Sequence, residues 1–396
     1  MTDINPKHAD NNQNPQESPE EDDSSVNLLR ERVIQSLKDQ GFVLTESGIQ
    51  PPDHTDKELL RRLHFLAVQH RIERASGLRS KEPMLIERIA AGSEVNPHCI
   101  APRLVEVLPG TQDELLFRYA ALHWSIPVSS GYGRRIRFLV LDSHNNRLIG
   151  VIGIGDPVFG LAARDQWIGW NSSERRIRLR HVLDAYVLGA VPPYSNLLGG
   201  KLIAMLATSN EVRSTFERKY AQKTALISGA SGDSRVAMLT TTSALGRSSM
   251  YNRIRFHGRL VFEPVGFTLG SGEFHFANGL YDELYSFVEA NCSPTAKNKN
   301  WGTGFRSRRE VVRKALRKLG LPHSLNFHGI RRQVFVAPLA TNSRQFLSGY
   351  ENVLDYSCSD MESLFSHFKE RWLLPRAGRN KSYRKFDPKT YLLWNK

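Results

Sequence analysis

The chain has 396 residues, 40% of them hydrophobic and 9% aromatic, which is enough for roughly two to three domains and a sizeable core. Its 54 lysines and arginines outnumber 40 acidic residues, and this excess of +14 is uneven. Residues 1–25 hold seven acids and one lysine, which leaves about +20 on the rest. Three widely spaced cysteines without a CxxC pair or a Cys/His cluster argue against a disulfide framework, and we expect no metal site.

The remaining class assignments follow from charge and hydropathy. No apolar run approaches the ~20 residues that span a bilayer, and the acidic N-terminus is unlike a signal peptide. We therefore expect a cytoplasmic protein without a membrane partner. A basic body favours a polyanionic partner, most simply nucleic acid, although a basic and inert surface gives the same charge.

The N-terminal part divides into a polar tail and a helical region. Residues 1–25 are rich in Asn, Gln, Pro and acids, and this composition predicts disorder. Apolar spacing predicts a helix over 27–40, and Thr55 with Glu58 forms a capping box that opens a second helix. The region 26–129 is predicted to be mainly helical and broken by prolines.

The period changes in the segment 130–276. Two β-rich runs, 136–141 and 148–154, flank Asn145 and Asn146 and predict a hairpin. Further strands are predicted at 185–191, 225–228, 236–241 and 260–268, with helices at 171–180, 196–207, 211–220 and 248–256. This alternation predicts an α+β or α/β sheet domain.

The last segment, 277–396, is predicted to be a basic helical extension. Helices are expected over 279–290 and 307–319, and the tail from residue 371 interleaves basic and aromatic side chains. The second helix has an apolar seam and a basic surface, which suits a nucleic acid or the acidic face of a partner protein. Its candidate nucleic-acid contacts are Arg308, Arg309, Arg313, Lys314 and Arg317.

The string VPPYSNLLGGKL (191–202) places a glycine-rich turn between a strand and a helix. Such a turn exposes backbone N–H groups to a phosphate, so Asn196, Gly199, Gly200 and Lys201 are candidate cofactor-binding residues. The alternative is tight packing of the helix on the sheet. The spacing does not fit a Walker loop.

Two other strings carry candidate residues. In RDQWIGW (164–170) the indoles suit either base stacking or the core, and Arg164 is a candidate nucleic-acid contact. We expect Arg164 and Asp165 to bond elsewhere rather than to each other. Arg134 and Arg135 of GYGRR (131–135) suit phosphate binding or a solvated strand start.

The string LTTTSALGRSSMYNR (239–253) contains a tyrosine at a strand-to-helix junction. Tyr251 could donate a proton to a leaving group, or simply pack its ring. Tyr251 and Asp165 are the candidate catalytic residues. No His-Asp relay accompanies the serines and threonines, so we predict no serine nucleophile.

Together with VGFTLGSGEFHF (265–276), these strings resemble the DruA family, over roughly residues 55–276. Arg71 to Arg74 (RIER) and Leu122 to Trp124 (LHW) also fit that family. The resemblance implies a role in antiviral defence, as a component of a Druantia antiphage system that confers phage resistance and includes a large helicase. It supplies no catalytic residue.

The order of elements from 135 to 268 also resembles the GNAT-type N-acetyltransferases, which implies a GNAT-like mixed central sheet. In that fold a turn of pattern Q/R-x-x-G-x-G/A, between a strand and a helix, holds the pyrophosphate of acetyl-CoA. Here the matching turn, Asn196 to Lys201, lacks the initial Gln or Arg of that pattern and has Lys201 where a small residue belongs.

Three functions remain open from the sequence. The first is a defence component that binds DNA, RNA or their intermediates with its partner proteins. The second is a GNAT-like transferase that uses a CoA-like or nucleotide donor, with Tyr251 as the acid. The third is an assembly scaffold whose basic surfaces meet an acidic partner.

Overall fold

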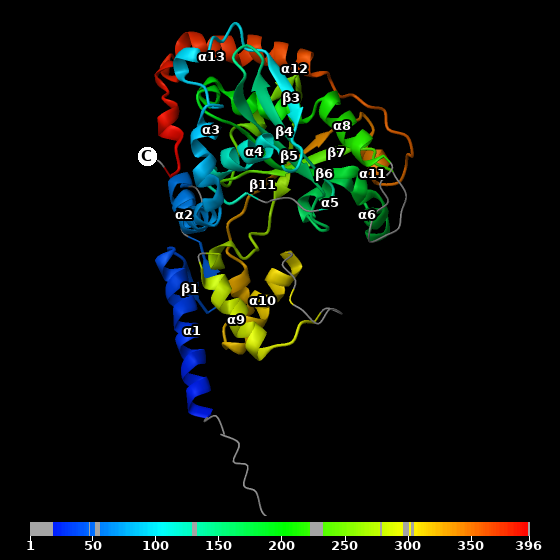
Figure 1. Ribbon diagram of the computed structural model, residues 1–396. Coiled ribbons are helices and arrows are strands. Elements are labelled where there is room, and N and C mark those ends of the chain that lie inside the picture. The colour runs from blue at the N-terminus through cyan, green and yellow to red at the C-terminus, as the bar shows by residue number, and fades with distance from the viewer. Residues whose placement is uncertain are drawn as a thin grey trace, which may run out of the picture.

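The computed structural model describes residues 19–46, 48–51, 56–128, 133–221, 233–277, 279–295, 301 and 305–394. Figure 1 shows a larger domain around a central sheet and a smaller helical module beneath it. The α-helices are α1 (Pro19–Asp39), α2 (Lys57–Arg74), α3 (Glu82–Ile86), α4 (Gln112–Leu122), α5 (Ala162–Ile168), α6 (Ser172–Arg178), α7 (Gly199–Ala207), α8 (Asn210–Tyr220), α9 (Leu280–Asn291), α10 (Phe305–Lys318), α11 (Ser343–Leu347), α12 (Met361–Phe368) and α13 (Leu374–Arg379). The strands are β1 (Val43–Thr45), β2 (Gly48–Gln50), β3 (Pro102–Glu106), β4 (Arg135–Asp142), β5 (Arg147–Gly155), β6 (Val182–Ala190), β7 (Met238–Thr242), β8 (Arg255–Phe256), β9 (Arg259–Leu260), β10 (Glu263–Phe267) and β11 (Gln333–Pro338).

Seven strands form the central sheet in the order β10-β11-β7-β6-β5-β4-β3. β6 and β7 run parallel and pair over Val182 to Asp184, while the other neighbours are antiparallel. The predicted hairpin is confirmed as β4 and β5, with Asn146 at a φ of 58°. Hairpin, β6, turn, α7 and β7 follow in the order that the GNAT-like resemblance implies. The predicted fold class, a mixed central sheet with helices at both ends of the chain, is confirmed.

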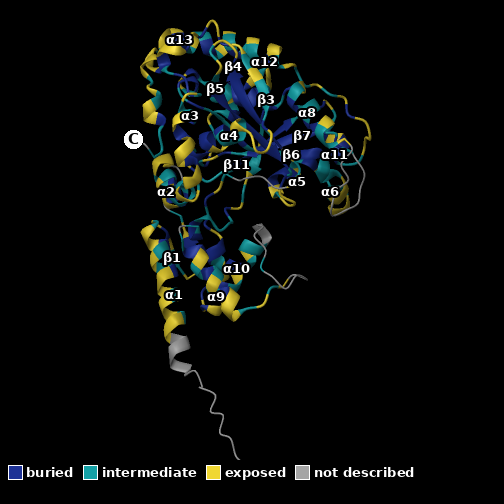
Figure 2. Cartoon of the chain, in the orientation of Figure 1, coloured by how far each residue is buried: buried dark blue, intermediate teal, exposed yellow. Residues whose placement is uncertain are grey.

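Helices cover both faces of the sheet, because successive side chains of a strand point to opposite faces. On one face, β4 residues such as Phe138 pack with α7, α8 and α12. On the opposite face, Leu139 of β4 and Val151 of β5 pack with α3 and α4, and α5 and α11 continue this layer beside β7 and β11. Figure 2 shows the resulting buried strands between more exposed helices.

The helical module joins segments that are far apart in the sequence. Its apolar core unites α1, β1 and β2 with α9 and α10 from the connection between β10 and β11. Arg32 of α1 donates to Glu283 of α9 at 2.7 Å. The sheet domain extends beyond the expected segment 130–276 at both ends, because it includes β3 and β11. The sequence predicted neither strand.

Two local predictions need correction, and two more fall outside the described residues. The helix predicted over 248–256 is wrong: a single 3₁₀ turn, Tyr251–Arg253, leads into the hairpin β8–β9. His257 (φ 46°) and Gly258 (φ 78°) form the turn of that hairpin, and their positive φ values are incompatible with a helix. The predicted disordered tail is also wrong where it is described, because α1 begins at Pro19. Residues 1–18 and the predicted strand 225–228 lie outside the described residues.

Candidate functional site

A basic pocket of about 450 Å³ opens on the face of the sheet that α4 covers. Its lining comes from α2, α4, β4 and β6. Among the described residues that line it, one is acidic, Glu114. Five are arginines, and we call this site the arginine pocket: Arg71, Arg74, Arg118, Arg135 and Arg137.

Glu114 offsets only part of this positive charge. Its carboxylate accepts a hydrogen bond from Gly110 N at 2.9 Å and pairs with Arg137 Nη2 at 2.9 Å. The Gly110 N–H, followed by Arg137, holds the pKa of Glu114 below its usual range. Arg71 donates through Nη2 to Ala121 O at 2.8 Å, and burial lowers the pKa of its guanidinium. The pocket therefore keeps a formal excess of four positive charges.

A β-bulge directs a tyrosine into this pocket. Ala185 pairs with Ile154 and Val187 pairs with Gly153, so Tyr186 is the extra residue on β6. Its ring lies over β5 because Gly153 has no side chain: a Cβ there would be 2.8 Å from the ring. Burial raises the pKa of Tyr186 to about 12, so the phenol remains a hydrogen-bond donor at neutral pH.

The carboxylate of Asp184, on β6, lies level across the sheet with Arg135, which lines the pocket. Arg135 pairs with Gly155, and Gly155 pairs with Asp184, so Arg135 and Asp184 flank a glycine. The hydroxyl of Thr240 donates to Asp184 Oδ1 at 3.1 Å. Burial raises the pKa of Asp184 to about 6, against the opposing effects of Thr240 and Arg164. A carboxylate with such a pKa exchanges a proton near neutrality, which is typical of functional sites.

The other predicted basic residues of the sheet domain bond within the protein. Arg134 forms an ion pair with Asp156 at 2.8 Å. Arg164 is fully buried and, contrary to our expectation, bonds to its neighbour Asp165 at 2.7 Å. Its guanidinium also donates to the carbonyls of residues 158 and 159. Asp165, a candidate catalytic residue, receives a second ion pair from Arg175 at 3.1 Å. Both Asp165 oxygens are thus engaged in holding α5 to its surroundings.

The glycine-rich turn packs closely against the protein. A Cβ at Gly199 would lie 2.7 Å from Tyr194 O, so this glycine permits contact between the helix and the preceding turn. The C-terminal segment covers the turn, because Arg376 Nε donates to Asn196 O at 3.1 Å. The Lys201 ammonium lies 5.0 Å from a ring centre of the Trp372 indole, and burial lowers its pKa.

Tyr251 lies on the same face of the sheet as this turn. Its ring is buried against those of Phe262 and Phe335, with centroids 5.0 and 5.1 Å away. Burial raises the pKa of Tyr251 to about 12. Its neighbour Met250 is next to the turn, because a Cβ at Gly200 would lie 3.1 Å from Met250 Sδ. This buried, aromatic environment is the one expected if Tyr251 only packs its ring, which was the second of its two roles considered from the sequence.

The basic helix predicted at 307–319 is α10, and its surface divides in two. The predicted apolar seam is buried in the helical module. Arg308 lies 3.9 Å from the ring centre of Tyr281, and Lys314 pairs with Glu310 at 3.1 Å. The three remaining candidates are exposed and spaced at four-residue intervals along one side of the helix: Arg309, Arg313 and Arg317.

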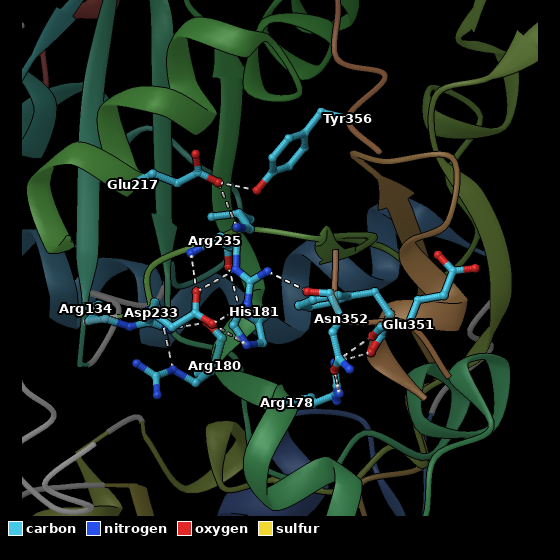
Figure 3. Close-up of polar contacts among 12 residues, drawn as sticks. Arg134, Arg178, Arg180, His181, Glu217, Asp233, Arg235, Glu351, Asn352 and Tyr356 are labelled. Carbon is cyan, nitrogen blue, oxygen red and sulfur yellow. Dashed lines mark hydrogen bonds and ion pairs between the residues drawn. The ribbon is translucent and has the colours of Figure 1, made fainter. Parts of the chain in front are cut away.

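A second polar network links the start of β6 to the start of β7 (Figure 3). Asp233 forms two hydrogen bonds with the Arg235 guanidinium, at 2.9 and 2.7 Å, and lies 3.6 Å from His181 Nε2. Arg235 Nη1 donates to Asn352 O at 2.8 Å, and Tyr356 donates to Glu217 at 2.6 Å. These contacts connect the starts of the two central strands β6 and β7 with α8 and the loop after α11, so the network holds this end of the sheet in place.

Four residues that line the pocket escaped the sequence analysis: Glu114, Arg118, Arg137 and Tyr186. Asp184, which lies outside the lining, escaped it too. Arg137, Asp184 and Tyr186 belong to strands with mainly apolar sequences, so they read as parts of core strands. The available signal was the polar pair within VLDAYVLG (182–189), opposite the glycines of VIGIG (151–155). Arg71 and Arg74 had been noted only as matches to the family.

The described residues form neither a metal-binding cluster nor a membrane-spanning helix. No three His, Cys, Asp or Glu side chains in that part of the chain are placed to hold a metal ion. Within it, no helix combines the length and apolar character needed to cross a membrane.

Comparisons with known proteins point to one family. The family described as Druantia protein DruA matches residues 54–349. A Druantia protein DruA from Escherichia coli (strain UMEA 4076-1) is 41% identical over 361 residues, which cover 90% of this chain and 89% of that protein. No solved structure matches significantly. The matched residues include the strands and helices that form the arginine pocket, and the chain belongs to the DruA family.

Proposed function

We propose that this chain is a component of a Druantia antiphage system that binds nucleic acid, or intermediates derived from it, in the arginine pocket. Partner proteins of the system, a large helicase among them, would act on the same nucleic acid. The observation that carries the proposal is the pocket itself, with five arginines around one glutamate.

The chemistry of the pocket suits phosphate. Guanidinium groups bind phosphate oxygens in a planar, often bidentate geometry and remain charged at every physiological pH. Arg74, Arg118 and Arg135 are exposed at the rim, whereas Arg71 and Arg137 are partly buried below them. This gradation would let a polyanion meet the rim by diffusion and place one phosphate deeper in the pocket.

The exposed side of α10 provides a second basic surface. Arg309, Arg313 and Arg317 follow one another on successive turns, a spacing that matches a row of phosphates or an acidic protein face. A pulldown of partner proteins with and without nuclease treatment separates these two uses. Retention of the partners after nuclease would favour the scaffold function for this helix.

Salt dependence tests the main proposal. Binding of single-stranded DNA and RNA should weaken linearly on a log–log plot, because each neutralised phosphate releases counterions. The double variant Arg74→Gln/Arg118→Gln should lower the slope by about 1.4, since each contact with a single strand contributes about 0.7, and the affinity by roughly tenfold or more.

Arg218→Gln, an exposed arginine on α8 across the sheet, is the matched control and should change neither quantity. Salt-independent binding, or equal losses in the pocket and control variants, would reject the proposed site.

One observation favours a second function, the transfer of an acyl or similar group from a CoA-like or nucleotide donor. β6 and β7 pair only as far as Asp184 and Thr240, after which β6 continues toward the glycine-rich turn. Gly200→Glu tests the turn better than a change at Gly199, where no side chain fits. If Gly200→Glu and Tyr251→Phe both fold and still protect cells from phage, the donor is not bound there.

A further inference from the structure

We propose that the arginine pocket reads a terminal phosphate, the phosphomonoester of a strand end or of a free nucleotide, rather than the internal phosphodiesters of a duplex. This inference rests on the proposed binding of nucleic acid and specifies its ligand.

The shape of the pocket favours a single nucleotide unit. Its volume, about 450 Å³, falls within the roughly 300–1,000 Å³ typical of small-molecule sites. The floor is sheet and the walls are two helices, α2 and α4, so the pocket is recessed between secondary-structure elements. A duplex presents its phosphates on a wide convex cylinder and reaches only the rim arginines. A terminal phosphate extends beyond its sugar and can enter.

Two donors lie deep in the pocket. Arg71 Nη1 and the Tyr186 hydroxyl are both buried, and neither has a hydrogen-bond partner among the described residues. Buried donors are normally satisfied in folded proteins, so such a pair beside a basic pocket points to a ligand that accepts hydrogen bonds. The bulge at Tyr186 and the absence of a side chain at Gly153 are the features that place this hydroxyl there.

The charge of the pocket matches a dianion better than a monoanion. A phosphomonoester carries about −1.5 to −2 at pH 7 and offers three acceptor oxygens, whereas a phosphodiester carries one negative charge. Glu114 pairs with Arg137, and the lining as a whole holds five guanidinium groups and one carboxylate. The ring of Tyr186, half-buried beside the pocket, adds an aromatic surface on which a base or sugar can rest.

The test compares the ends of otherwise identical single strands. Fluorescence anisotropy would measure binding of a labelled oligonucleotide with a 5′-phosphate, a 3′-phosphate or only hydroxyl ends, and competition by a nucleoside monophosphate or its nucleoside. We expect at least a tenfold preference for one phosphorylated end over the hydroxyl-ended strand.

Tyr186→Phe, which keeps the ring, and Arg71→Lys, which keeps the charge, should each reduce that preference by about threefold to tenfold. Both variants should lower the affinity for the phosphorylated strand more than the affinity for the hydroxyl-ended strand. Arg218→Gln on α8 serves again as the control. Competition by the monophosphate but not the nucleoside identifies a pocket for free nucleotides, and an end preference without such competition identifies a strand-end reader. Both results support the inference.

The two proposals fail in distinguishable ways. Salt-dependent binding of all three strands with equal affinity would overturn the terminal-phosphate inference and leave nucleic-acid binding intact. Binding of the monophosphate without any strand would reject nucleic-acid binding while supporting the pocket ligand. Absence of binding by strands and monophosphate alike would reject both.

Discussion

Acidification should destabilise the protein through three histidines buried where the helical module meets the sheet domain. His64 of α2 lies with His275 and His328 around the ring of Phe274, which is 4.4 Å from His64 and 4.6 Å from His328, between centroids. Burial lowers their pKa values to about 3, about 4 and about 3, respectively. The buried guanidinium of Arg332, near His64 and His328, acts in the same direction on both.

The stability falls at low pH because the folded and unfolded chains bind different numbers of protons. A histidine that stays neutral in the folded protein takes up a proton on unfolding below pH 6.5, so stability is lost as the pH falls from 6.5 toward the folded pKa. Between pH 7.5 and 5.5 each of the three loses about 1.4 kcal/mol, which sums to about 4 kcal/mol. His181, also buried with a pKa of about 4, adds a similar loss. Asp184, whose pKa is raised to about 6, opposes it by about 0.8 kcal/mol.

The net loss of about 4–5 kcal/mol is a large part of the 5–15 kcal/mol typical of a folded domain. Urea unfolding followed by circular dichroism at pH 7.5 and 5.5 measures it. His275→Gln, whose amide can replace the ring N–H that bonds Leu325 O, should reduce the loss by about 1.4 kcal/mol. His98→Gln, at an exposed position, is the control. Equal stability at both pH values, or an unchanged loss in His275→Gln, would refute this account of the histidine cluster.

Two further predictions concern close contacts. Gly199→Ala should cost about 1–3 kcal/mol of stability, because its Cβ would lie 2.7 Å from Tyr194 O. Gly160→Ala, with nothing within 4 Å, should cost nothing in the same thermal-unfolding assay. Glu82→Ala should release the C-terminal segment, because this fully buried carboxylate accepts the Leu393 N–H at 2.6 Å. Limited proteolysis should then remove that segment faster than from the wild type, and equal rates would contradict the prediction.

The sequence predicted elements where local signals agree with the tertiary structure. Asn171 caps α6 at the start of the helix predicted over 171–180, and Asn146 supplies the positive φ of the β4–β5 turn. The helix predicted over 248–256 failed because the chain there leads into a hairpin whose turn, at His257 and Gly258, has positive φ values. Strands β3 and β11 were missed because their pairing partners lie elsewhere in the chain, and a short apolar run does not reveal its partner.

The candidate site was only partly accessible from sequence for a related reason. Arg135 stood out because it belongs to an adjacent pair of basic residues. Tyr186 did not, because its direction depends on a bulge that exists only once β5 and β6 pair. The arginines of α2 and α4 converge with those of β4 through packing between distant segments. Charge composition therefore led to the prediction of a polyanion partner, whereas the proposed position of its site depends on the fold.

The two candidate phosphate sites, the glycine-rich turn and the arginine pocket, lie on opposite faces of the sheet. On the face with α7, the C-terminal segment covers the glycine-rich turn, and its aromatics, expected from sequence to be available for nucleic acid, pack inward: Tyr383 is buried and Trp372 lies against Lys201. On the opposite face, the arginine pocket is open between α2 and α4. A phosphate donor at the turn would need Arg376 and Trp372 to move away, since both contact it. A phosphate in the arginine pocket requires no such displacement, and for this reason we propose that face, rather than the turn, as the position of a phosphate ligand.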